Sequence, residues 1–170
     1  MIIFFIGYMG CGKSYVVNKL ANDVKDAKVI DMDSEIEKLE GKSITEIFET
    51  KGEKYFRKKE TKFIESLIGS KPHELILVAT GGGAPIKNID LMNEIGTTIY
   101  IKLSPEEIYN NLKKDDLNKR PLLKNLSDED LMNKTFDYCK TKKYNICMID
   151  TKNHTDDQII NVKEYKHTHS

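Results

Sequence analysis

The sequence is short of cysteine, proline and tryptophan, and it has no excess of charge of either sign. Its 170 residues include three cysteines, four prolines and no tryptophan. Three irregularly spaced cysteines, Cys11, Cys139 and Cys147, are too few for a disulfide framework or a cysteine-based zinc site. The 27 basic and 27 acidic residues cancel, so no overall electric field favours nucleic acid or a membrane surface as a partner.

Long apolar runs are also missing. The opening run 2–6 is far too short to span a bilayer, and it has neither a basic segment before it nor a cleavage-like segment after it. Hydrophobic residues make up 39% of the chain and charged residues 32%, which is typical of a globular protein with a single core. We therefore expect a cytoplasmic protein that folds as one domain over residues 1–170 and is a monomer.

Short apolar runs alternate with longer amphipathic stretches. The runs 2–6, 28–31, 75–79, 97–101 and 146–149 predict five strands, and several lack polar alternation, as expected for strands buried on both faces of a parallel sheet. Ser43 with Glu46 is a predicted capping box, and Pro105 and Ser127 mark two further helix starts. This alternation predicts a three-layer α/β domain with right-handed crossovers.

Residues 7–14 read GYMGCGKS and match the pattern G-x-x-x-x-G-K-[ST]. The match follows a predicted buried strand and leads into a helical pattern, which is the context that a phosphate-binding loop requires. Lys13 would reach the β- and γ-phosphates of ATP, and the Ser14 hydroxyl would bind Mg²⁺. The alternative is a glycine-rich turn that binds nothing. The candidate ATP-binding residues here are Gly10, Cys11, Gly12, Lys13, Ser14 and Tyr15, with Cys11 expected to be a small tolerated side chain rather than a nucleophile.

Two carboxylates follow the second predicted strand. Asp31 and Asp33 would lie near its carboxyl end, where ligands bind in open α/β sheets, and a period of two would point them the same way. One would hold Mg²⁺ through water, and the other would orient or deprotonate a hydroxyl group. The alternative is helix capping by Asp33 or Ser34, which accounts for only one of the two carboxylates.

Arg57 and Arg120 are the only arginines among the 27 basic residues. In so lysine-rich a chain, a retained arginine indicates that planar, bidentate contacts matter, although Arg57 is also compatible with a surface helix position. The glycines 81–83 follow the third predicted strand and permit a ligand to approach the backbone closely. A tight strand–helix turn would use some of these glycines too.

In order and spacing, residues 2–150 resemble the shikimate kinase family. The matching segments are GYMGCGKS, VIDMDSEIEKLEGKSITEIFETKGEKYFRKKE, ATGGGA and KRPLL, and the second is the most specific, because a generic P-loop ATPase has no reason to contain it. The resemblance implies a kinase fold like that of nucleoside monophosphate kinases, with a five-stranded parallel sheet, substrate-binding helices and a mobile lid at about residues 113–125. It also implies an Mg²⁺-dependent transfer of the ATP γ-phosphoryl group to the 3-hydroxyl of shikimate.

The resemblance also assigns roles by position. Asp33 would bind the shikimate hydroxyls and serve as base or orienting group, and Arg57 would pair with the shikimate carboxylate. Gly82 and Gly83 would donate backbone N–H bonds to the substrate. Asp31 would support Mg²⁺.

The remaining catalytic role falls to Arg120, the lid arginine, which would reach over the phosphates on closure. Together with Lys13 and Asp33 it makes up the expected catalytic set.

Two positions depart from the family. Lys140, four residues before Tyr144, stands where the family usually has a second carboxylate-binding arginine, and Asn111 stands where an arginine often lies near the adenine. Lysine keeps the charge but loses the fork geometry, so Lys140 is either a substrate contact or one of several solvated lysines. A related gluconate-type kinase and a non-catalytic binding protein are the alternative functions.

Overall fold

The structure is a computed structural model that describes residues 1–102, 105–114, 121, 127, 129–130 and 147–150. Its five strands form one sheet in the order β2-β3-β1-β4-β5, with every neighbouring pair parallel. The strands are β1 (Ile2–Ile6), β2 (Lys28–Asp31), β3 (Ile76–Ala79), β4 (Thr97–Lys102) and β5 (Cys147–Asp150). The five predicted strands are thus confirmed to within one residue at each end, as is the parallel sheet.

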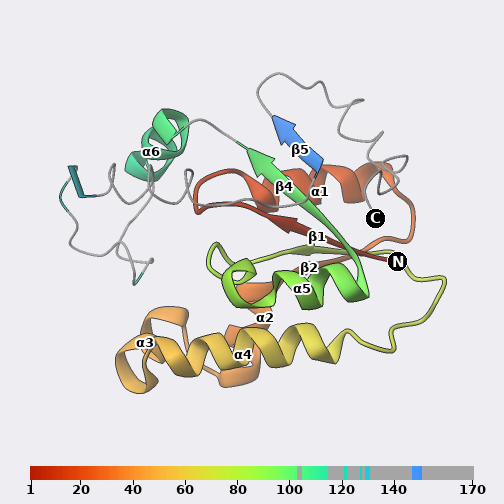
Figure 1. The fold of residues 1–170 in the computed structure, drawn as a ribbon, viewed down its shortest axis with the longest axis horizontal. Helices are drawn as coiled ribbons and strands as arrows, with labels where there is room; N and C mark the ends of the chain where they lie inside the picture. Colours follow the sequence, from red (N-terminus) through yellow and green to blue (C-terminus); the bar gives the residue numbers. More distant parts are fainter. Residues whose placement is uncertain (103–104, 115–120, 122–126, 128, 131–146, 151–170) are drawn as a thin grey trace.

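Helices cover both faces of this sheet, which confirms the expected three layers (Figure 1). The helices are α1 (Lys13–Asp23), α2 (Met32–Glu40), α3 (Ile44–Lys51), α4 (Glu53–Ser66), α5 (Pro85–Ile95) and α6 (Pro105–Lys114). Side chains of α1 and α6 share one hydrophobic cluster with one face of the sheet, and α2 to α5 share a second cluster with the other face.

The central strand β1 explains why its sequence is apolar throughout. All five of its residues are buried. Ile3 and Phe5 pack into the cluster that contains α1, whereas Phe4 and Ile6 pack into the cluster on the opposite face. Because successive side chains of a strand point to opposite faces, a strand covered on both sides has no position for a polar residue.

The predicted helix starts are recovered where the structure describes them. Ser43 Oγ accepts from the Glu46 N–H at 3.2 Å while Glu46 Oε2 accepts from the Ser43 N–H at 2.7 Å, so the capping box is present. Ser127 Oγ accepts from the Asp130 N–H at 3.1 Å. Helix α6 begins at Pro105 and ends at Lys114. The first two positions of the expected lid are therefore helical, and most of its remainder lies outside the described residues.

The sheet order fixes where a ligand would bind. Strand β1 lies between β3 and β4, and the chain leaves β1 towards β2 on one side before it returns to β4 on the other. The carboxyl end of β1 is therefore the switch point of the sheet, where open α/β proteins form a crevice. Within the part of the chain that the structure describes, no helix is both long and apolar enough to cross a membrane.

Candidate active site

The loop between β1 and α1 has the geometry of an anion cradle. Gly10 and Gly12 have φ values of 80° and 87°, in the left-handed region that favours glycine. Among the described residues, no side chain caps the N-terminus of α1. The first N–H groups of that helix therefore lack an internal partner and are suited to an anionic ligand.

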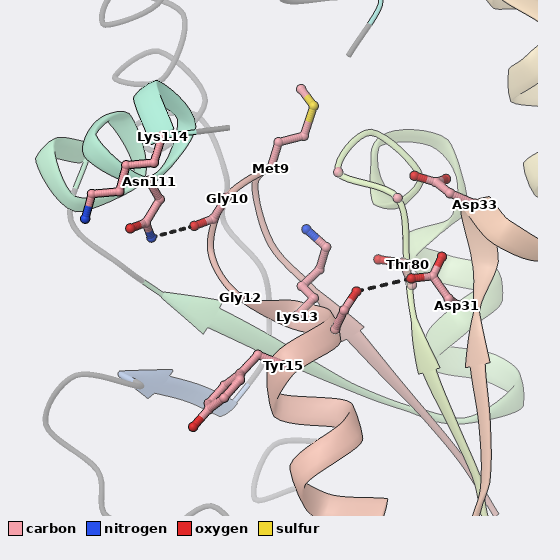
Figure 2. Close-up of a pocket in the computed structure, with 13 residues that line it drawn as sticks. Met9, Gly10, Gly12, Lys13, Tyr15, Asp31, Asp33, Thr80, Asn111 and Lys114 are labelled. Carbon is pink, nitrogen blue, oxygen red and sulfur yellow. Dashed lines mark hydrogen bonds between the residues drawn. The ribbon is translucent and has the colours of Figure 1, made fainter. Parts of the chain in front are cut away.

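A pocket of about 470 Å³ opens beside this loop, at the carboxyl edge of the sheet (Figure 2). It combines the loop with the ends of β2 and β3 and with the last turns of α6. Figure 2 shows Asn111 and Lys114 on one side of the loop and Asp31 and Asp33 on the other. The lining residues are Met9, Gly10, Gly12, Lys13, Ser14, Tyr15, Asp31, Asp33, Thr80, Gly81, Gly82, Asn111 and Lys114.

Lys13, the first residue of α1, folds back over the loop. Its ammonium donates to the backbone oxygens of Gly7 at 2.8 Å and Tyr8 at 3.0 Å. The charge is thereby held at the pocket, within reach of any phosphate that the cradle binds. Because a phosphate oxygen is negatively charged and a carbonyl oxygen is neutral, bound phosphate would attract the ammonium more strongly than these two carbonyls do.

Asp31 links the loop to the second strand. Ser14 Oγ donates to Asp31 Oδ2 at 3.2 Å, and Asp31 Oδ1 accepts from the Ser34 N–H at 3.1 Å and so caps α2. The strand-period argument for Asp31 and Asp33 is wrong, because β2 ends at Asp31 and Asp33 lies in the first turn of α2. The cap is also Asp31 rather than Asp33 or Ser34. Both aspartates nevertheless line the pocket.

The hydroxyl of Ser14 and the carboxylate of Asp31 fit a hard divalent cation. Mg²⁺ prefers oxygen ligands, keeps several waters and takes only one or two protein groups at phosphate-transfer sites. No group of three or more histidine, cysteine or acidic side chains is arranged for a metal within the described residues. The pair therefore suits a cation that phosphate also binds, and does not suit an all-protein metal cage.

Asp33 lies in an environment that opposes its charge. Its Oδ1 atom is buried, and among the described residues it has no hydrogen-bond partner. Burial raises the pKa of Asp33, the nearby Asp31 carboxylate adds to the rise, and the Lys13 ammonium opposes it. A carboxylate with a raised pKa is a better proton acceptor, and Asp33 is one of the residues that line the pocket.

Arg57 is held from both sides on α4. Its Nη1 donates to Glu60 Oε1 at 2.6 Å, and its Nη2 donates to Glu53 Oε1 at 3.3 Å. Glu60 is fully buried, and burial raises its pKa to about 7 against the opposing effect of Arg57. Burial disfavours the charge of Arg57, but the Glu60 and Glu53 carboxylates together outweigh burial and raise the pKa of that guanidinium.

The glycine turn after β3 fits closely over these side chains. A Cβ at Gly81 would lie 2.8 Å from Asp33 Oδ1 and 3.0 Å from Glu60 Oε2, and one at Gly83 would overlap the Arg57 guanidinium. Charged side chains of two helices, Asp33 of α2 and Arg57 and Glu60 of α4, therefore meet at this turn. We call Asp33, Arg57, Glu60 and the glycines 81–83 the acceptor cluster.

The structure brings most of the predicted site residues together. Gly10, Gly12, Lys13, Ser14, Tyr15, Asp31, Asp33 and Gly82 line the pocket. Cys11 does not, because its side chain is 1% exposed and packs in the core, consistent with a small structural role. Arg57 and Gly83 are not among the residues that line the pocket, and they contact each other in the acceptor cluster. Arg120 and Lys140 lie outside the described residues.

Some site residues were missed from the sequence. Glu60 follows Arg57 by three positions on a helix, a spacing that places two side chains together and was the available signal. Thr80 and Lys114 also line the pocket. Asn111, noted only as a departure from a family pattern, donates from Nδ2 to the Gly10 carbonyl at 2.8 Å.

Comparisons with known proteins point to one family. A family model described as shikimate kinase matches residues 9–164. The chain is 44% identical over 124 residues to a shikimate kinase of Persephonella marina, and the match covers 72% of each sequence. It is 43% identical over 125 residues to a shikimate kinase of Clostridium botulinum, and that match covers 72% of this chain and 71% of the relative. Its fold is similar to the structure of shikimate kinase from Acinetobacter baumannii in complex with shikimate, with a TM-score of 0.75 and 28% identity over 95% of this chain and 87% of the other.

Proposed function

Because the chain belongs to the shikimate kinase family, we propose that it transfers the γ-phosphoryl group of ATP to the 3-hydroxyl of shikimate. The observation that carries this proposal is the position of Asp33. This carboxylate lines the pocket beside the phosphate-binding loop, and its Oδ1 also lies against Gly81 in the acceptor cluster. A phosphate donor and a hydroxylated acceptor would therefore meet at one side chain.

The donor side is built from the loop and the start of α1. The first N–H groups of α1 would bind phosphate oxygens, and the Lys13 ammonium would leave the Gly7 and Tyr8 carbonyls to contact the β- and γ-phosphates. Ser14 and Asp31 would hold Mg²⁺, Asp31 through water. When bound, Mg²⁺ would supply positive charge that neutralises the phosphate oxygens.

The acceptor side is built from the acceptor cluster. Arg57 presents a planar cation of 14% side-chain exposure, oriented by Glu60 and Glu53. A guanidinium held in this way is suited to a bidentate contact with a carboxylate. We propose that Arg57 makes this contact with the shikimate carboxylate. The N–H groups of Gly82 and Gly83 would donate to oxygen atoms of shikimate. We also propose that Arg120 contacts the phosphates on lid closure and that Lys140 supplies a single ammonium contact to the shikimate carboxylate.

The chemical step is a single displacement. A lone pair of the acceptor hydroxyl oxygen forms the new O–P bond, and the bond between the γ-phosphorus and the bridging oxygen to the β-phosphate breaks. The hydroxyl proton passes to a carboxylate oxygen of Asp33, and ADP leaves with the bridging electrons. Positioning and charge neutralisation supply most of the acceleration in such transfers. A lid formed by residues 113–125 would exclude water as a competing acceptor when it closes.

A coupled assay of ADP release, with and without shikimate, tests this proposal. We expect ADP release to depend on shikimate, with a product that carries one phosphate on the 3-oxygen. Shikimate-independent ADP release, or stimulation by gluconate instead, would reject it. The family match favours shikimate over the gluconate-type alternative. A single domain, a monomeric state and a cytoplasmic location remain proposals that rest on the composition of the chain.

A further inference from the structure

Helix α6 packs directly against the phosphate-binding loop. Gly10 has a φ of 80°, and a Cβ there would lie 3.1 Å from Leu112 Cγ and 3.5 Å from the Ile108 carbonyl oxygen. Leu112 and Ile108 are fully buried in the cluster that also contains Cys11. The loop therefore rests on the side of a helix that lies 101 residues further along the chain.

The peptide unit between Gly10 and Cys11 is held at both ends. The Asn111 amide nitrogen donates to the Gly10 carbonyl oxygen at 2.8 Å (Figure 2), and the N–H of Cys11 donates to the Tyr8 carbonyl oxygen at 3.2 Å. Both bonds restrain the same peptide plane. Rotation of that plane would break both of them.

This restraint matters because the loop has carbonyl oxygens as well as N–H groups. A carbonyl oxygen turned towards the pocket would repel a phosphate oxygen, and a glycine resists such a peptide rotation less than other residues do. Lys13 contacts the Gly7 and Tyr8 carbonyls, and under the proposed function it would leave both of them on contacting phosphate. Asn111 is uncharged, so phosphate oxygens attract its amide less than they would a lysine ammonium, and the amide can remain on the Gly10 carbonyl.

We propose that Asn111 is a positioning residue for the nucleotide: its amide holds the Gly10 carbonyl away from the phosphate site and keeps the loop in its binding conformation. The inference rests on the proposed function in that the anion is taken to be ATP. Loss of the amide would oblige ATP to order the loop as it binds. Nucleotide affinity would then fall, while shikimate affinity would not change.

The chain offers a matched control in Asn110. Asn110 and Asn111 are adjacent, exposed residues of α6, and Asn110 is not among the residues that line the pocket. Replacing either by alanine changes helix propensity equally. Replacing either by aspartate adds one negative charge to the same helix turn, but only Asn111→Asp removes the donor from the Gly10 carbonyl.

Calorimetry with a non-hydrolysable ATP analogue and Mg²⁺, and separately with shikimate, tests the proposal on the full chain. We expect Asn111→Ala to raise the Kd of the analogue about three- to tenfold, the range for loss of one neutral hydrogen bond, and to leave the shikimate Kd unchanged. Asn111→Asp should raise the Kd of the analogue more than Asn110→Asp does. Asn110→Ala should bind the analogue with the same Kd as the parent protein.

Three results would overturn the inference: an unchanged Kd for the analogue in Asn111→Ala, an equal loss in Asn110→Ala, or an equal loss of shikimate affinity in Asn111→Ala. The first removes the role, the second assigns the effect to helix propensity, and the third makes it a general structural effect. If the parent protein fails to bind the analogue, the proposed function itself is wrong, and the inference falls with it.

Discussion

Arg57 and Glu60 form a 2.6 Å ion pair across one turn of α4, and the carboxylate of that pair is fully buried. Only one of its oxygens is satisfied by the arginine. The other, Oε2, is buried and has no hydrogen-bond partner among the described residues. The pair therefore orients Arg57, but it keeps the Glu60 carboxylate in an environment that disfavours its negative charge.

The pH dependence of stability should reveal this arrangement. The pKa of Glu60 is raised from 4.5 to about 7 by burial, with Arg57 opposing the rise. A group whose pKa is higher in the folded state contributes stability below its unfolded pKa and loses it as the pH rises through the folded pKa. Relative to Glu60→Gln, which cannot ionise, the parent should lose at most roughly 3 kcal/mol of stability between about pH 4.5 and pH 8.

Denaturant unfolding of both proteins at several pH values measures that difference. Glu53→Gln is the control, since it removes the half-exposed partner of the same arginine, and an exposed pair is worth under about 1 kcal/mol. A constant difference between parent and Glu60→Gln across this pH range would show that Glu60 ionises as an ordinary surface carboxylate does.

Arg57 itself should control the affinity for shikimate. Arg57→Ala removes a charge-assisted contact worth about 1.5–3 kcal/mol, or roughly ten- to a hundredfold in Kd. ATP affinity should change little, because Arg57 is not among the residues that line the phosphate pocket. Lys58→Ala, the exposed neighbour on α4, should leave both affinities unchanged. Calorimetry that finds the parent's shikimate Kd in Arg57→Ala would remove Arg57 from the site.

Lys13 is expected to be needed for transfer but not for folding. It is partly exposed at the start of α1, so Lys13→Ala should preserve the fold, as judged by circular dichroism. Turnover should fall by orders of magnitude, because the transition state loses a charge that contacts the transferred group. Lys25→Ala, an exposed lysine in the turn after α1, is the control. Near-normal turnover in Lys13→Ala would contradict the kinase assignment.

The two aspartates should separate into different roles. Asp31 accepts from the Ser14 hydroxyl, whereas Asp33 keeps an unpartnered oxygen next to Gly81. Asp31→Asn should therefore raise the Mg²⁺ concentration needed for half-maximal activity, and Asp33→Asn should lower kcat with little change in that concentration. Titration of activity with Mg²⁺ distinguishes them. Equal Mg²⁺ dependence in both variants would show that Asp31 has no part in holding the cation.

Local signals predicted the fold and the donor site well. The run 2–6 has no polar residue because β1 is covered on both faces, and the GYMGCGKS loop carries its geometry in two left-handed glycines. Such features depend on neighbouring residues, so the sequence displays them. The strand-period argument for Asp31 and Asp33 was wrong because the helix cap, considered at Asp33 or Ser34, lies earlier at Asp31, and α2 begins at Met32.

Long-range contacts were harder to predict. The bond from Asn111 to Gly10 joins positions 101 residues apart, and no local pattern marks an exposed asparagine as a loop contact. The overlap between Gly83 and Arg57 likewise depends on how α4 packs beneath the turn after β3. For Glu60 the spacing from Arg57 was visible, but its burial follows from the packing of α2, α4 and the glycine turn.

The glycine at position 83 should be required because of Arg57. A methyl group there would overlap the guanidinium, so Gly83→Ala must displace Arg57 or the turn that is proposed to bind shikimate. We expect Gly83→Ala to raise the Kd for shikimate about as much as Arg57→Ala does.

The double variant tests whether the two residues act through one contact. In the Arg57→Ala background the methyl group has room, so adding Gly83→Ala should raise the shikimate Kd little further. This non-additivity is what two residues in direct contact produce. Calorimetry on the parent, both single variants and the double variant measures it. Fully additive losses would show that Gly83 acts through its own N–H group or backbone, independently of the arginine.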